Sequence, residues 1–208
     1  MNTTLSSILE HKIIAILRGI KLKDIVPVSE ALYEGGIRVL EITMNSARPL
    51  AAIEEAVDRL GEKMVIGAGT VLDPETARSA ILCGAKFVLS PTVDKSTIKM
   101  CKRYGSVCIP GAYTPTEILT GYSAGGDLIK VFPANSPSYL KDIAGPLPHI
   151  PLLPTGGVNL DNIREFKKAG AVGFGLGGSL VDSNQEITPE YLALLTQKAK
   201  QFVEAVAD

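Results

Sequence analysis

A lysine occupies the centre of an apolar segment that has the composition of a short buried strand. Lys130 lies in the segment Leu128-Ile129-Lys130-Val131-Phe132-Pro133. Because burial disfavours the ammonium form, the pKa of such a lysine should fall, and a neutral amine is a nucleophile. Schiff-base chemistry on a ketone or an aldehyde requires a group of this kind. The alternative is a lysine that extends its charged end to solvent from the end of a strand.

Arg18 and Glu41 are two further ionisable residues in segments that have the composition of strands. Arg18 ends segment 14–18, and Glu41 lies within segment 38–43. Alternate side chains of a strand point to the same face, so both are predicted to point inward with Lys130, at the carboxyl ends of the strands. Burial of two cations and one anion is costly unless the charges pair, and a purely structural network is one interpretation. The functional interpretation makes Lys130 an amine nucleophile, Glu41 a general acid/base and Arg18 an electrophilic clamp.

Two glycine clusters supply the other half of a candidate site. One is Pro154-Thr155-Gly156-Gly157-Val158-Asn159, and the other is Gly175-Leu176-Gly177-Gly178-Ser179. In barrel enzymes the loops after the seventh and eighth strands bind phosphate through backbone N–H groups. We therefore predict phosphate binding here, with ordinary tight turns as the alternative for either cluster alone. A third segment, Gly67-Ala68-Gly69-Thr70, either offers the Thr70 hydroxyl to a substrate carboxylate or forms a simple turn.

These residues would be positioned by a regular alternation of short β-branched segments and amphipathic segments. Strands are predicted at residues 13–17, 38–43, 64–67, 86–89, 107–109, 128–132, 151–154 and 172–176, and helices at 24–33, 48–60, 74–83, 95–104, 115–122, 139–144, 160–169 and 189–206. Such alternation implies parallel pairing and right-handed crossovers, and eight units favour a closed (β/α)8 TIM barrel. A helix over residues 3–10 would close the bottom of the barrel. An open doubly wound sheet is the alternative, but segment 17–20 lacks the glycine fingerprint that usually follows its first strand.

The composition is that of one globular domain spanning residues 1–208. Hydrophobic residues make up 46% and charged residues 21%, and the formal net charge is -1, so no electrostatic footprint for nucleic acid or an anionic membrane exists. No apolar run reaches the roughly 18 residues of a membrane span, and the first residues do not have the pattern of a secretory signal. Cys83, Cys101 and Cys108 lie in apolar surroundings, typical of reduced thiols in a cytoplasmic protein. A reactive cysteine is the alternative.

The histidines do not have the pattern of a metal site. His11 and His149, the only two, both lie at or just before a strand start, hence at the end of the barrel opposite the candidate site. No cluster of Cys, His and Asp has the spacing of metal ligands. We predict neither a metal nor a cofactor.

Together these residues resemble the 2-keto-3-deoxy-6-phosphogluconate aldolase family, also called the KDPG/KHG aldolases. The resemblance extends over almost the whole chain, from residue 14 to residue 181. It is carried by Gly35-Gly36-Ile37-Arg38-Val39-Leu40-Glu41-Ile42-Thr43, Gly67-Ala68-Gly69-Thr70-Val71-Leu72, Ile129-Lys130-Val131-Phe132-Pro133-Ala134 and Pro154-Thr155-Gly156-Gly157-Val158.

The resemblance implies a role for each candidate residue. Lys130 would be the Schiff-base lysine and Glu41 the proton-transfer residue. The keto-acid pocket would be lined by Thr70, Pro91, Phe132 and Thr155, and the phosphate would be held by Gly156, Gly157, Gly177, Gly178 and Ser179. The family also implies a homotrimer.

The segment after the glutamate departs from the family pattern. Many members carry an arginine there, where this chain has Met44-Asn45-Ser46. Arg18, within Leu17-Arg18-Gly19-Ile20, is predicted to bind the substrate carboxylate instead. This combination is closer to the branch of the family that acts on the galactonate-derived epimer.

The sequence therefore predicts a metal-independent class I aldolase that cleaves 2-keto-3-deoxy-6-phosphogluconate to pyruvate and glyceraldehyde 3-phosphate. The same reaction on 2-keto-3-deoxy-6-phosphogalactonate or on 4-hydroxy-2-oxoglutarate is an alternative. More distant alternatives are a phosphosugar epimerase or isomerase and a non-catalytic binder of a phosphate ligand, since a barrel fold hosts many functions.

Overall fold

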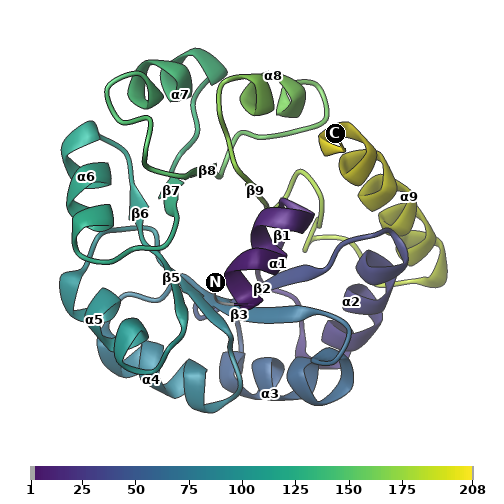
Figure 1. Cartoon of the computed structure of the whole chain (residues 1–208). Helices are drawn as coiled ribbons and strands as arrows, with labels where there is room; N and C mark the ends of the chain where they lie inside the picture. The colour runs from purple at the N-terminus through teal and green to yellow at the C-terminus, as the bar shows by residue number, and fades with distance from the viewer. Residues whose placement is uncertain (1–2, 208) are drawn as a thin grey trace.

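Strands and helices alternate almost throughout the computed structural model, which describes residues 3–207. The strands are β1 (Ile13–Leu17), β2 (Val39–Thr43), β3 (Val65–Gly69), β4 (Phe87–Leu89), β5 (Val107–Ile109), β6 (Gly111–Ala112), β7 (Ile129–Val131), β8 (Leu152–Pro154) and β9 (Phe174–Leu176). The helices are α1 (Thr3–His11), the 3-10 helix η1 (Leu22–Asp24), α2 (Ile25–Glu34), α3 (Pro49–Leu60), α4 (Pro74–Leu82), α5 (Lys95–Arg103), α6 (Pro115–Ser123), α7 (Pro137–Ala144), α8 (Ile163–Lys168) and α9 (Pro189–Val206). Helices α2 to α9 form a ring around the strands (Figure 1).

The strands form two parallel sheets. A curled sheet of six strands has the order β5-β4-β3-β2-β1-β9, and a sheet of three has the order β6-β7-β8. Pro110, which has no N–H to donate, separates β5 from β6. The sheets are linked by an isolated bridge between Thr155 and Gly175 and by a hydrogen bond of 2.8 Å from Asp127 N, just before β7, to Cys108 O in β5. The predicted parallel α/β fold is confirmed, whereas one continuous eight-stranded barrel stays a prediction.

The strand side chains alternate between two hydrophobic clusters. The inner cluster contains Ile14, Val39, Phe87, Leu89, Val107, Ile109, Leu128 and Leu153. The larger outer cluster packs the strands against the helices and contains, from β2, Leu40 and Ile42. The alternation predicted for residues 38–43 is therefore confirmed, and it leaves Glu41 on the inner face with Val39.

Helix α1 packs against the inner cluster near the amino ends of the strands. Ile8 is buried within that cluster, and Leu5 and Leu9 pack against it. The helix ends directly before β1, where Lys12 N donates to Ile8 O at 2.9 Å. In Figure 1, α1 lies across the middle of the ring. A helix covering the amino ends of the strands, opposite the candidate site, agrees with the prediction from residues 3–10.

Element boundaries differ from the predicted ones where local side-chain bonds decide them. The helix predicted from residue 160 begins at Ile163, because Asn159 and Asn162 hold the preceding residues in a turn. Asn162 Oδ1 accepts from Asn159 N at 2.9 Å, and Asn159 Oδ1 accepts from Asp161 N at 2.9 Å. Strand β6 and helix η1 are short elements that the sequence did not predict. Within residues 3–207, no helix combines the length and apolar composition needed to cross a membrane.

Candidate active site

Lys130 is the central residue of β7 and is only 2% exposed. Its neighbours in the strand are Ile129 and Val131, which belong to the outer cluster, so the lysine points to the inner face. The Nζ atom lies 4.7 Å from the centroid of the Phe132 ring. Burial lowers the pKa of the ammonium group, the Glu41 carboxylate opposes this shift and the Arg18 guanidinium adds to it. The predicted burial of this lysine is therefore confirmed, and burial lowers its pKa.

Glu41 is fully buried in β2, at 0% exposure. Neither of its carboxylate oxygens has a hydrogen-bond partner among residues 3–207. Burial raises the pKa of this carboxyl, and the positive charges of Lys130 and Arg18 oppose the shift. A buried carboxyl without partners is costly, and such groups are found where a ligand, a water or a reaction uses them.

The small residues of β3 make room for this carboxyl. A Cβ atom on Gly69 would overlap Glu41 Oε1, and one on Gly67 would overlap the ring of Phe87. Gly67 pairs with Glu41 across the two strands, and Gly69 pairs with Thr43. The segment from Gly67 to Thr70 is therefore more than a turn, because its glycines accommodate the acid and an inner-cluster ring.

Arg18 differs from its prediction. The residue follows the end of β1 and is exposed, so the structure does not bury three charges together. Its guanidinium donates to Asn45 Oδ1 at 3.4 Å and to Thr70 Oγ1 at 3.5 Å. Exposure avoids the desolvation of a third charge, which would have had no buried partner. Its charge still acts on both buried groups, since it shifts the pKa of Glu41 and of Lys130.

A cavity of about 360 Å³ opens at the carboxyl ends of β1, β8 and β9. Its lining is Ile16, Arg18, Phe132, Thr155, Gly156, Gly157, Val158, Asn159, Gly175, Gly177, Gly178 and Ser179. All five residues predicted to hold phosphate are among them, together with Arg18 and with two of the four predicted pocket residues, Phe132 and Thr155. Two of the lining residues contact further candidate residues: the Phe132 ring lies beside Lys130 Nζ, and the Arg18 guanidinium donates to the Thr70 hydroxyl.

The glycines of the two loops have different roles: the backbone conformation requires glycine in the loop after β8, whereas the glycines after β9 border open space. Gly156 and Gly157 have φ angles of 76° and 95°, which a residue with a side chain rarely adopts. A Cβ atom on Gly177 or Gly178 would meet no atom within 4 Å. Backbone bordered by open space permits the close approach of an anion to N–H groups.

Thr155 is 4% exposed, and its Oγ1 atom has no hydrogen-bond partner among the described residues. The hydroxyl packs against Gly175, where a Cβ atom would overlap it. Because Thr155 lines the cavity, its buried hydroxyl is placed to bind a polar group of a ligand.

Pro91 lies outside this cavity. It lines a neighbouring hollow of about 360 Å³ together with Tyr113 and Phe132. Phe132, 37% exposed, borders both spaces and forms the wall between them. The predicted contact of Pro91 with the same ligand as Thr155 therefore remains untested.

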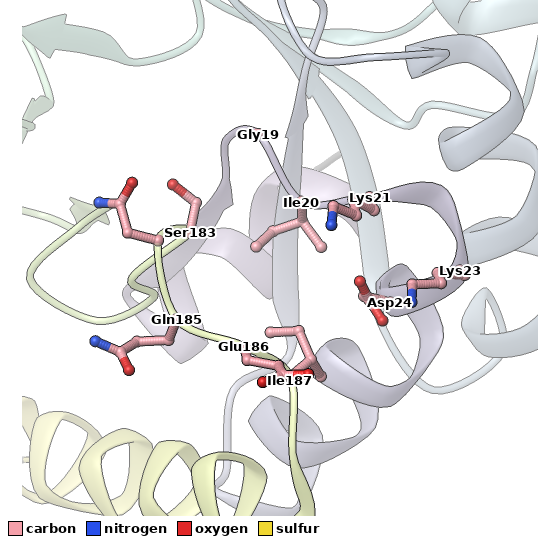
Figure 2. Close-up of a pocket in the computed structure, with 10 residues that line it drawn as sticks. Gly19, Ile20, Lys21, Lys23, Asp24, Ser183, Gln185, Glu186 and Ile187 are labelled. Atoms are coloured by element: carbon pink, nitrogen blue, oxygen red, sulfur yellow. The ribbon is translucent and has the colours of Figure 1, made fainter.

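A further hollow of about 370 Å³ lies beside the loop after β1. One side is formed by Gly19, Ile20 and Lys21, and the other by the segment from Ser183 to Ile187 (Figure 2). This hollow was not predicted. It borders Gly19, the residue that follows Arg18.

Asn45 and Ser46 are site residues that sequence reasoning noted only as a departure. Asn45 contacts Arg18, and Ser46 Oγ accepts from Gly19 N at 2.9 Å. Their position directly after β2, the strand that carries Glu41, could have indicated that they belong to the site. Residues 3–207 contain no group of three or more His, Cys, Asp or Glu side chains placed to hold a metal ion.

Comparison with known proteins agrees with this geometry. The sequence model of the KDPG and KHG aldolase family matches residues 5–197. The 2-dehydro-3-deoxy-6-phosphogalactonate aldolase of Escherichia coli is 34% identical over 196 residues, covering 93% of each chain. The 2-dehydro-3-deoxy-phosphogluconate aldolase of Pseudomonas aeruginosa is 37% identical over 163 residues, covering 76% of this chain and 72% of that protein.

A solved structure extends the comparison to three dimensions. The KDPG aldolase of Legionella pneumophila, with pyruvate captured as a covalent carbinolamine intermediate, superposes with a TM-score of 0.83. It is 26% identical, and the match covers 95% of this chain and 97% of that one. The chain therefore belongs to the KDPG and KHG aldolase family and is an aldolase, which is a lyase.

Proposed function

We propose that this chain is a class I aldolase that cleaves 2-keto-3-deoxy-6-phosphogluconate to pyruvate and glyceraldehyde 3-phosphate through a Schiff base on Lys130. The observation that carries the proposal is Lys130 itself, 2% exposed on the inner face of a parallel sheet and with a lowered pKa. A neutral amine adds to a carbonyl carbon, and a desolvated lysine is the usual way to obtain one. The covalent carbinolamine in the related Legionella structure supports this type of chemistry.

In the first half of the reaction, Lys130 Nζ attacks the C2 ketone of the substrate. The carbinolamine that forms loses water to give a protonated imine, and Glu41 transfers protons during this step, directly or through a water. Its raised pKa suits the task, because a group that both gives and takes protons works best with a pKa near the operating pH. Its two oxygens, which have no hydrogen-bond partner among residues 3–207, are available to substrate.

In the second half, the carbon chain is cleaved. Glu41 takes the proton of the C4 hydroxyl, the C3–C4 bond breaks, and its electron pair moves into the protonated imine to form an enamine. Glyceraldehyde 3-phosphate leaves. Protonation of the enamine at C3 and hydrolysis of the imine then release pyruvate and restore the Lys130 amine.

Substrate binding divides between the two ends of the cavity. We propose that Arg18 and Thr70 bind the carboxylate, since the Arg18 guanidinium already reaches the Thr70 hydroxyl. The phosphate would lie at the opposite end, against Gly156, Gly157, Gly177, Gly178 and Ser179. Phe132 and Thr155 would form the walls between them, and Pro91 would contact the pyruvate half from the far side of Phe132.

Two experiments test the proposal. Reduction with borohydride in the presence of pyruvate should attach the reduced adduct to Lys130, as peptide mass spectrometry would show. An adduct on another lysine, or none, would contradict the mechanism. A coupled assay of the gluconate and galactonate 6-phosphates then decides the epimer, because the relatives carry both names. The galactonate epimer and 4-hydroxy-2-oxoglutarate are the alternative substrates.

We also infer that the two sheets form one closed eight-stranded barrel. The hydrogen bonds from Asp127 N to Cys108 O at 2.8 Å and from Lys130 N to Pro110 O at 3.0 Å continue the pairing across Pro110. The bridge between Thr155 and Gly175 links β8 to β9. Slow hydrogen exchange at the Asp127 and Lys130 amides would support closure, and rapid exchange there would contradict it.

The family resemblance leads us to propose a homotrimer in the cytoplasm. Light scattering should then give a mass of about three times the 22.0 kDa of the chain. A monomer mass at working concentration would contradict the trimer, and fractionation of cells would test the location.

A further inference from the structure

The loop that carries Arg18 is weakly supported on its outer side. Arg18 and Gly19 are both exposed, whereas Leu17 before them and Ile20 after them are buried in the core. Gly19 has a φ angle of 72°, so the loop bends sharply at this point. In Figure 2 Gly19 lies at the top of the loop, beside a hollow that Ser183 also lines. Packing of buried side chains therefore holds Leu17 and Ile20, but not the two residues between them.

Hydrogen bonds to the end of β2 supply the missing support. Gly19 N donates to Ser46 Oγ at 2.9 Å, Ser46 Oγ and Thr43 Oγ1 are 2.8 Å apart, and Thr43 Oγ1 donates to Leu17 O at 3.4 Å. One arrangement of hydrogens satisfies all three bonds, with Ser46 donating to Thr43. The chain of bonds thus connects the two residues that flank Arg18, Leu17 and Gly19, to one strand end.

The contacts of the Arg18 side chain do not hold it by themselves. Its bonds to Asn45 and Thr70 measure 3.4 Å and 3.5 Å, which is long for a guanidinium donor. The position of the guanidinium therefore depends on the backbone at residues 17–19. Thr43, fully buried in β2, provides the rigid end of the connection, because it is the last residue of the strand that carries Glu41.

We propose that Ser46 is a positioning residue: its hydroxyl fixes the loop after β1 so that Arg18 faces the cavity and binds the substrate carboxylate. This inference rests on the proposed function, in which Arg18 is the carboxylate group's partner. Ser46 touches neither Lys130 nor Glu41 in any hydrogen bond, so it acts on binding and not on the chemical steps. Loss of its hydroxyl should raise KM and leave kcat nearly unchanged.

The test compares Ser46→Ala with Ser46→Thr and with a matched control. Ser79→Ala removes a serine hydroxyl that donates to Glu75 O at 2.9 Å on the exposed face of α4, far from the cavity in sequence and fold. Ser46→Ala should raise KM about two- to tenfold, the usual effect of one hydrogen bond. Ser46→Thr, which keeps the hydroxyl, should remain close to wild type, and so should Ser79→Ala.

A second arm links the effect to Arg18. In an Arg18→Met background, Ser46→Ala should add no further increase in KM, because the residue that it positions is absent. An equal increase in both backgrounds, a fall in kcat without a change in KM, or an unchanged KM would each overturn the inference.

Borohydride trapping keeps this test separate from the proposed function. The pyruvate concentration that gives half-maximal adduct should rise in Ser46→Ala, at an unchanged maximum. If wild type forms no adduct at Lys130, the proposed function falls, and the Ser46 inference falls with it. If wild type forms the adduct and Ser46→Ala matches it at every pyruvate concentration, only the Ser46 inference falls.

Discussion

The segment from Asp127 to Lys130 contributes one residue to each of two lysine–carboxylate pairs. Asp127 precedes β7 and pairs with Lys102, whose Nζ lies 2.7 Å from Asp127 Oδ1. The side chains are 45% exposed for Lys102 and 19% exposed for Asp127. Asp127 Oδ2 also accepts from Cys108 N at 2.8 Å, so both oxygens of this carboxylate have partners.

The second pair, Lys130 and Glu41, reverses each of these properties. Exposure falls to 2% and 0%, and neither Glu41 oxygen has a hydrogen-bond partner among the described residues. Burial lowers the lysine pKa and raises the glutamate pKa, so desolvation outweighs their mutual attraction. The same two chemical groups thus form a hydrogen-bonded pair near the surface, and a buried pair whose carboxylate has no hydrogen-bond partner among the described residues and which we propose to be reactive. A buried carboxyl without hydrogen-bond partners, and not merely a lysine beside a carboxylate, therefore distinguishes the second pair.

The largest expected effect separates the two lysines. Lys130→Met should reduce turnover by at least about 10⁴-fold, because no other amine can form the imine. The matched control, Lys102→Met, removes the lysine of the exposed pair and should leave turnover close to wild type. Steady-state cleavage of the phospho sugar acid measures both. Comparable losses in the two variants would mean that burial does not distinguish the reactive lysine.

Glu41→Gln should have the next largest effect. The amide keeps the size of the carboxyl but cannot transfer protons, so kcat should fall by about 10²–10⁴-fold. The adduct between Lys130 and pyruvate should still form under borohydride, only more slowly, since the nucleophile is intact. A variant with unchanged kcat would remove Glu41 from the mechanism and leave its burial unexplained.

Strand composition and alternation were enough to predict the elements of the fold other than β6 and η1, and two inner residues. The segments around Glu41 and Lys130 are short, β-branched and flanked by turns. Alternation of side chains along each strand was therefore enough to predict that Glu41 and Lys130 point inward. The two glycine loops were predicted because each cluster follows a strand segment, and in the first of them Gly156 and Gly157 have φ angles of 76° and 95°. Pairing across Pro110 was not predictable, because it depends on how neighbouring strands tilt and not on the residues within one strand.

The environment of Arg18 was beyond the reach of sequence reasoning for a related reason. Parity assigned it to the inner face, but it follows the last residue of β1, where the strand geometry no longer holds. Its partners, Asn45 and Thr70, come from loops after two other strands. Contacts between loops depend on the backbone shapes of those loops. Thr70, for example, has a φ of 57°, and a threonine in the sequence does not indicate a positive φ.

The pH dependence of stability sharpens the comparison. The pKa of Glu41 is raised above 4.5 in the folded state, so between 4.5 and the raised value the folded protein holds a proton that the unfolded chain has lost. The stabilisation from this group is present below pH 4.5 and is lost as the pH rises through the raised pKa. In Glu41→Gln the side chain does not titrate, so the variant does not lose stability in this way. Urea unfolding on both sides of pH 4.5 should show the variant gaining on wild type as the pH rises, and a constant difference would contradict the shift.

The smallest effects should come from the exposed pair. Asp127→Ala removes the acceptor of the buried Cys108 N–H, and an unpaired buried amide costs about 1–3 kcal/mol in the free energy of unfolding. Lys102→Met leaves that bond intact and removes only a partly exposed ion pair, which contributes about 0.2–1 kcal/mol. Chemical denaturation should therefore rank Asp127→Ala as the less stable variant, with turnover per folded molecule near wild type in both. If Asp127→Ala instead lost turnover without losing stability, the carboxylate would be acting through β7 on Lys130, and the two pairs would be one network.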